Sequence, residues 1–70
     1  MSDSISIQVN GEPRSVAANG TLLDLLEHLG LDERAVVVER NREIVRRPSL
    51  SQTAVTEGDQ IELVHFVGGG

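Results

Sequence analysis

The sequence predicts an α+β fold in which a mixed sheet of four to five strands packs on one main helix. Residues 5–9 alternate apolar and polar side chains, as a strand with one buried face does. Leucines recur at helical spacing within residues 22–29, and further aliphatic runs follow at residues 35–38 and 60–67. Because a short helix and an isolated hairpin are both unstable alone, the helix must bury its leucines against one face of the sheet.

The first expected element is a β-hairpin. Asn10 and Gly11 directly follow the alternating run, and this pair tolerates the positive φ angles of a type I′ turn. The return strand is then residues 12–17. Pro13 cannot donate a ladder hydrogen bond, so the start of this strand is expected at a sheet edge.

A helix over residues 22–29 comes next. Thr21 occupies the expected N-cap position, with Asp24 three residues later as its capping-box partner. Gly30 ends the helix because a residue without Cβ can adopt the left-handed conformation after the last turn. His28 lies in that last turn and is expected to face solvent rather than act in catalysis.

The second half of the chain contains the remaining strands. The β-branched run at residues 35–38 predicts a strand covered on both faces or nearly so, and close to the centre of the sheet. Residues 44–45 form a short strand. Residues 49–56 are expected to be irregular, with Leu50 and Val55 pointing inward.

Residues 57–59 form a turn, and residues 60–67 are the last strand. Parallel pairing of the first and last strands at the centre of the sheet would make the fold a β-grasp. In the last strand, alternation turns Ile61 and Leu63 toward the core, with His65 on the same side as a packing or hydrogen-bonding residue. The domain is expected to span residues 1–67.

Composition excludes several classes of function. The chain has no Cys, and its two histidines are far apart, so no metal site is expected. Eleven acidic residues against six basic ones give a formal charge of −5, which disfavours binding to nucleic acid. No signal peptide or membrane span is recognisable. A single cytoplasmic domain is expected.

The end of the last strand is the candidate functional region. Val64 and Phe66 alternate onto the face away from the core. They either form an exposed apolar patch that marks a partner surface, or are covered by residues 49–56. Residues 68–70 are three glycines, expected to form a flexible tail.

The tail has a chemical use. Three glycines without side chains can thread a narrow channel and carry the α-carboxylate of Gly70 to its end. A carboxylate at neutral pH is a poor electrophile, so it reacts only after activation, for example by ATP to an acyl-adenylate. The sequence contains no phosphate-binding motif of its own, which makes this protein the substrate rather than the enzyme.

Three stretches resemble a known family. VVVERNREIV at residues 36–45, EGDQIE at 57–62 and VHFVGGG at 64–70 are similar to the ThiS family, the sulfur carriers of thiamine biosynthesis. The similarity runs from about residue 5 to residue 70. It implies a ubiquitin-like β-grasp fold and a carrier without catalytic residues or a bound cofactor.

The resemblance also implies a reaction sequence. Gly70 would be adenylated by a ThiF-like adenylating enzyme, related to ubiquitin-activating enzymes, which uses ATP. A sulfur donor system would convert the adenylate to a thiocarboxylate, and thiazole synthase would take the sulfur. Gly68 and Gly69 would thread into the partner's active site. Val64, Phe66 and Val67 would dock against the partner.

Other functions stay open on the sequence. The small subunit of molybdopterin synthase also presents a terminal thiocarboxylate, but it tends to carry proline before its glycine pair, where this chain has valine. Sulfur carriers of other pathways and an inert β-grasp interaction module are further alternatives. If a partner does bind, Glu39, Glu43 and Glu62 are candidates for an acidic docking face.

Overall fold

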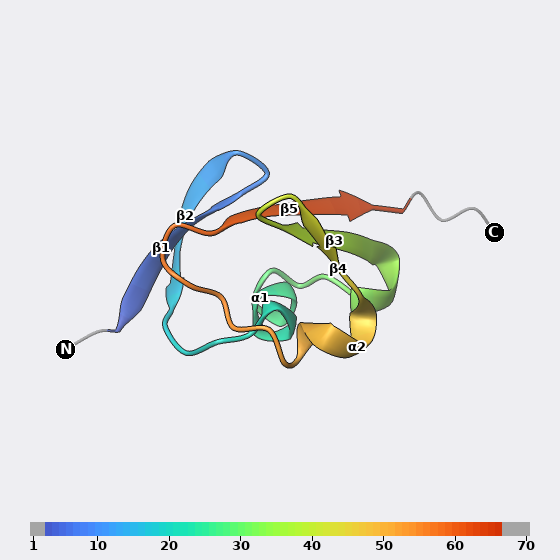
Figure 1. The fold of residues 1–70 in the computed structure, drawn as a ribbon, viewed down its shortest axis with the longest axis horizontal. Helices are drawn as coiled ribbons and strands as arrows, with labels where there is room; N and C mark the ends of the chain where they lie inside the picture. The colour runs from blue at the N-terminus through green and yellow to red at the C-terminus, as the bar shows by residue number, and fades with distance from the viewer. Residues whose placement is uncertain (1–2, 67–70) are drawn as a thin grey trace.

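The computed structural model describes residues 3–66. Its five strands form one sheet in the order β2-β1-β5-β3-β4, with both α-helices on one side of it (Figure 1). The elements are β1 (Ser4–Val9), β2 (Glu12–Ala17), α1 (Leu22–His28), the 3₁₀ turn η1 (Glu33–Ala35), β3 (Val36–Arg40), β4 (Glu43–Val45), α2 (Arg47–Leu50) and β5 (Gln60–His65). β1 and β5 pair in parallel and the other neighbours are antiparallel. The predicted β-grasp is therefore confirmed.

The hairpin between β1 and β2 has the predicted turn. Asn10 has a φ of 53° and Gly11 a φ of 81°, so both central residues are left-handed, as type I′ requires. β2 pairs only with β1 and is an edge strand. Pro13 on this edge costs the sheet no hydrogen bond, because its nitrogen lies at a position that does not face β1.

Both ends of α1 are closed by hydrogen bonds. The Thr21 hydroxyl accepts from the Asp24 N–H at 3.2 Å, and the Asp24 carboxylate accepts from the Thr21 N–H at 2.9 Å, which completes the predicted capping box. At the other end Gly30 has a φ of +74°. The N–H of Leu31 then donates to the Leu26 carbonyl at 2.9 Å, as in a Schellman motif.

The core lies between the sheet and the helices. Leu22, Leu25 and Leu26 of α1 are buried, as their spacing predicts. The predicted inward anchors Leu50 and Val55 are also buried, at 2% and 5% exposure. The remaining buried apolar residues come from β1, β3 and β5: Ile7, Val9, Val36, Val38 and Ile61.

The structure corrects three expectations. Residues 47–50, expected as a strand end followed by an irregular segment, form the short helix α2, which has Pro48 in its first turn, where a missing N–H does no harm. β3 is internal and lies next to the central strand β5, so its predicted place near the centre of the sheet is confirmed. The run in β3 is not covered on both faces: Val36 and Val38 are buried, while Val37 faces the other side and is only half-buried. The predicted packing role of His65 is wrong, since its side chain is exposed although it lies opposite the buried Val36.

Candidate functional site

The last strand is anchored on both sides. β5 pairs in parallel with β1 and antiparallel with β3. Beyond its last strand residue the Phe66 N–H still donates to the Ala35 carbonyl at 2.8 Å. The described chain is therefore held by the sheet up to Phe66.

An exposed apolar surface lies beside this point. Val64 is 56% exposed and Phe66 52%, and on β4 Ile44 is 65% exposed. The register places Val37 of β3 directly opposite Val64, and directly opposite residues share a face. We call Val37, Ile44, Val64 and Phe66 the outer patch.

Both helices cover the other face of the sheet (Figure 1). Leu50 and Val55, the inward anchors of residues 49–56, belong to the core beneath α1. The alternative that this segment covers Val64 and Phe66 is therefore wrong. The prediction that these two side chains form an exposed apolar patch is confirmed, and their predicted role in docking a partner stays a prediction.

Acidic residues border the outer patch. Glu39 of β3 lies directly opposite Glu62 of β5, and Glu39 also faces Ile44 of β4. Two carboxylates in directly opposite positions repel each other. The third acidic candidate, Glu43, is paired with Arg40 on the helix side of the sheet, so it does not belong to this face. The outer patch with its acidic border suits a partner surface that is apolar and basic.

The turn before β5 is fixed by a buried carboxylate. Asp59 is 4% exposed. It accepts from the Thr56 N–H at 2.8 Å, the Arg40 guanidinium at 2.9 Å and the Asn41 amide at 3.1 Å. Burial raises the pKa of Asp59, but the hydrogen bonds from Thr56, Arg40 and Asn41 outweigh it and hold the pKa below its ordinary value. The carboxylate therefore stays charged and ties β5 to the end of β3.

Four of the predicted site residues lie outside the described part of the chain. These are Val67, Gly68, Gly69 and Gly70, and the roles predicted for them stay predictions. The predicted boundary between the domain and a glycine tail lies outside the described residues too. Within residues 3–66 no group of three or more acidic, histidine or cysteine side chains is placed to hold a metal ion. The helices of the same residues are all too short or too polar to cross a membrane.

Sequence reasoning missed two members of the outer patch. Ile44 and Val37 belong to β4 and β3, and only the pairing of those strands with β5 brings them to Val64. A partial signal was available. Alternation along the β3 run puts Val37 on the face opposite Val36 and Val38.

Comparison with known proteins identifies close relatives. The model of the ThiS family matches residues 7–70. A relative from Bacillus subtilis (strain 168), named sulfur carrier protein ThiS, is 40% identical over 65 residues, which are 91% of this chain and 98% of the relative. A longer relative from Paramagnetospirillum magneticum, named thiazole synthase, is 48% identical over 66 residues, which are 94% of this chain. The chain spans only 20% of the length of that longer relative.

Solved structures agree with the fold. The crystal structure of a thiamine biosynthesis protein (ThiS) from Geobacter metallireducens superposes with a TM-score of 0.81 at 35% identity, covering 94% of this chain and 100% of the other. A ubiquitin-like protein from Trypanosoma brucei superposes with a TM-score of 0.59 at 25% identity, covering 93% and 98% of the two chains. The β-grasp is therefore ubiquitin-like.

Proposed function

This chain belongs to the ThiS family, and from that premise we propose that it is a sulfur carrier of thiamine biosynthesis that works as the substrate of an adenylating enzyme. The proposal gives the chain no catalytic residue of its own. The carboxylate of Gly70 is the reacting group, and residues 67–70 carry it into the active site of the partner. The β-grasp domain supplies the surface by which the partner recognises the carrier.

Two transfers make up the proposed reaction. The Gly70 carboxylate attacks the α-phosphorus of ATP, forming an acyl-adenylate and releasing pyrophosphate. A donor that delivers sulfur at the oxidation level of sulfide then replaces AMP at the carbonyl carbon, leaving a thiocarboxylate. Its sulfur is nucleophilic and can pass to an acceptor. Because the chain has no Cys, the carrier offers no competing thiol.

One observation carries the proposal beyond family membership. The exposed outer patch lies directly beside the last described residue, and the Phe66 N–H is hydrogen-bonded to Ala35. A partner bound to the outer patch would also be bound close to Phe66, which directly precedes residues 67–70 and is held by the sheet. Holding one reactant in place in this way saves entropy in the chemical step. An inert scaffold would have no need of this arrangement.

The acceptor is proposed to be a thiazole synthase. The support comes from the longer relatives from Paramagnetospirillum magneticum and Magnetococcus marinus, which are both named thiazole synthase and contain a segment similar to this chain. If such a relative joins a carrier segment to its acceptor in one polypeptide, the link raises the effective concentration of the acceptor around the carrier segment.

The docking role is tested by pyrophosphate exchange into ATP, catalysed by a ThiF-like adenylating enzyme with this protein as substrate. Phe66→Ala removes the largest exposed apolar side chain of the outer patch. We expect the KM for the carrier to rise by about tenfold, a typical loss for an aromatic residue at an interface. Val16→Ala, on the far edge strand β2, is the matched truncation and should leave KM unchanged.

The two variants must also be compared for folding. The thermal melt of Phe66→Ala should match the parent closely, because Phe66 is exposed. Val16 is partly buried against the core, so Val16→Ala should melt somewhat lower while remaining folded at the assay temperature. An unchanged KM for a folded Phe66→Ala variant would contradict the proposal that the outer patch docks against the adenylating enzyme. An equal rise for Val16→Ala would do the same, because the effect would then not be local.

A further inference from the structure

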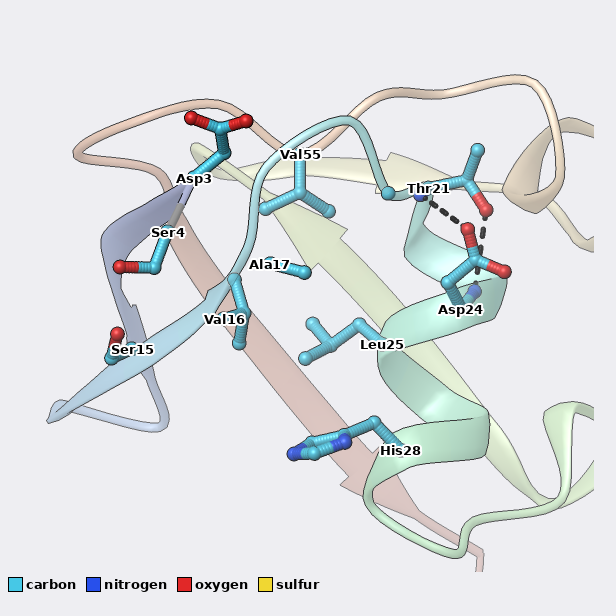
Figure 2. Close-up of a pocket in the computed structure, with 11 residues that line it drawn as sticks. Asp3, Ser4, Ser15, Val16, Ala17, Thr21, Asp24, Leu25, His28 and Val55 are labelled. Atoms are coloured by element: carbon cyan, nitrogen blue, oxygen red, sulfur yellow. Dashed lines mark hydrogen bonds between the residues drawn. The ribbon is translucent and has the colours of Figure 1, made fainter. Parts of the chain in front are cut away.

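A second surface, separate from the outer patch, lies at the opposite edge of the sheet. It is a groove between β2 and α1 with a volume of about 540 Å³ (Figure 2). The sheet order β2-β1-β5-β3-β4 puts β1 and β5 between this edge and β3. The two surfaces can therefore be occupied at the same time, and the inference drawn from the groove does not rest on the proposed function.

The groove has an apolar floor. Val16 of β2 and Leu25 of α1 face each other across it, and Val55 closes one end (Figure 2). Leu25 and Val55 are buried in the core, so the floor is fixed by packing. Such a surface can hold one or two aliphatic side chains and is within the usual volume of a ligand site.

One wall of the groove is an unpaired strand edge. In the hairpin, Val9 and Glu12 flank a two-residue turn and so exchange hydrogen bonds, and the pattern alternates from there along the register. The backbone N–H and C=O groups of Ser15 and Ala17 accordingly point away from β1. Within residues 3–66 no strand pairs with this side of β2. An added strand could accept and donate hydrogen bonds here, beside the apolar floor.

Charge decides which occupant fits. The lining of the groove carries the carboxylates of Asp3 and Asp24 and no arginine. Asp3 is exposed near one end, and His28 of α1 lies at the other (Figure 2). A second copy of this chain, with a formal charge of −5, would be repelled. A strand that carries basic residues would be attracted.

We propose that the groove binds an extended segment of a partner protein by β-strand addition to β2, with aliphatic side chains on the Val16 and Leu25 floor and a basic residue near Asp3. Backbone hydrogen bonds to Ser15 and Ala17 hold the segment in register. The apolar floor selects its alternate side chains. This would let a carrier be held by one protein while its other surface is used by another.

The probe is a synthetic peptide of alternating valine and threonine with an arginine at each end, acetylated and amidated. It is titrated into ¹⁵N-labelled protein while amide chemical shifts are followed. We expect saturable shifts at Ser15, Ala17 and Leu25, with a Kd below about 1 mM, and none at Val64. The same peptide with glutamate in place of arginine should bind at least about fivefold more weakly.

Two charge variants sharpen the test. Asp3→Lys should weaken binding of the arginine peptide by about two- to tenfold, as expected for reversing one exposed charge. Glu43→Lys changes the net charge equally but lies on β4, at the other edge of the sheet, and should leave the affinity unchanged. Equal weakening by the two variants would mean unspecific attraction and would overturn the proposal.

A backbone variant tests strand addition itself. Ser15→Pro removes an edge N–H without removing a hydrogen bond to β1, and should abolish binding if the variant keeps the thermal midpoint of the parent. Full binding by the folded variant would contradict strand addition. If the variant does not fold, the comparison of Asp3→Lys with Glu43→Lys decides whether the groove is the binding site. Shifts confined to the outer patch, no shifts at all, or concentration-dependent shifts of β2 without peptide, which would indicate a second copy as occupant, would each overturn the proposal.

Discussion

At the scale of single residues, Asp59 fixes the start of β5. Its carboxylate collects donors from the Thr56 backbone, from Arg40 and from Asn41 at distances of 2.8 to 3.1 Å. Arg40 and Asn41 lie at the end of β3 and in the turn after it. One buried side chain thus joins the turn before β5 to the end of the neighbouring strand.

Removing the carboxylate should destabilise the whole domain. Asp59→Ala leaves the Thr56 N–H and the Arg40 and Asn41 side chains without their acceptor. We expect the free energy of unfolding to fall by about 1–3 kcal/mol, measured by urea denaturation. Asp32→Ala is the control, because Asp32 is exposed: its carboxylate pairs with the Arg34 side chain and accepts the Arg34 N–H at the start of η1, so its removal should cost less. Equal losses for the two variants would contradict the role given to Asp59.

The same carboxylate should make stability depend on pH. Its hydrogen bonds hold the pKa of Asp59 below its ordinary value in the folded protein, against the opposing effect of burial. The stabilisation is therefore complete above the pKa of the unfolded chain and is lost as pH falls through the folded pKa. We expect the urea midpoint to decrease from about pH 5 downward. Asp59→Asn should flatten this decrease, and an unchanged slope in that variant would assign the effect to other groups.

At the scale of elements, one pair of residues on β3 and β5 lowers the stability of the free domain and is proposed to favour docking. Glu39 and Glu62 lie directly opposite each other beside the outer patch. Like charges in such positions destabilise a sheet. Relief of this repulsion by a basic partner would favour the complex, so the pair fits a docking role better than a structural one.

Removing one of the two charges should therefore stabilise the free domain and weaken docking. For Glu62→Gln we expect the free energy of unfolding to rise by about 0.2–1 kcal/mol, while the KM for the carrier in pyrophosphate exchange increases. Glu27→Gln on α1 makes the same change of charge on the other side of the sheet and should do neither. A Glu62→Gln variant that docks as well as the parent would exclude the acidic border from the interface.

The end of α1 offers a test of backbone conformation alone. Gly30 has a φ of +74°, and a Cβ added there would meet no atom within 4 Å. Gly30→Ala should therefore cost only the strain of the left-handed conformation, about 1–2 kcal/mol of unfolding free energy. Gly20→Ala, where φ is not left-handed and the nearest atom is 3.6 Å away, should cost less in the same denaturation experiment. The reverse order would contradict this account of the helix end.

At the scale of the whole molecule, two surfaces occupy opposite parts of the sheet. The outer patch spans β3, β4 and β5 on the face away from the helices, and the groove lies between β2 and α1. We expect them to act independently. Phe66→Ala should leave the affinity for the arginine peptide unchanged, and saturating peptide should leave the KM for the carrier unchanged. A shift of either value by more than about threefold would show coupling between the surfaces.

Local signals predicted most of this fold. The hairpin followed from Asn10 and Gly11, and α1 followed from Thr21, Asp24 and its leucines, because turns and caps are set by neighbours in sequence. The short helix α2 has no side-chain cap and only four residues, so its pattern was too weak to distinguish it from a loop.

The candidate site was predictable only in part. Val64 and Phe66 followed from alternation along one strand. Ile44 joined them through the pairing of β4 with β3, and the groove arose where β2 passes α1. Neither follows from a local pattern, because both depend on the packing of elements that are distant in sequence.

The most direct test of the carrier is mass spectrometry of the intact protein after incubation with ATP, a ThiF-like adenylating enzyme and a sulfide source, followed by iodoacetamide. The chain contains no Cys, so a thiocarboxylate would be its only strongly nucleophilic sulfur. The account predicts replacement of one oxygen by sulfur and one alkyl adduct, both localised to Gly70 by fragmentation and both absent without ATP. A protein that gains neither, while a known carrier of the family is converted by the same enzyme, would contradict the account.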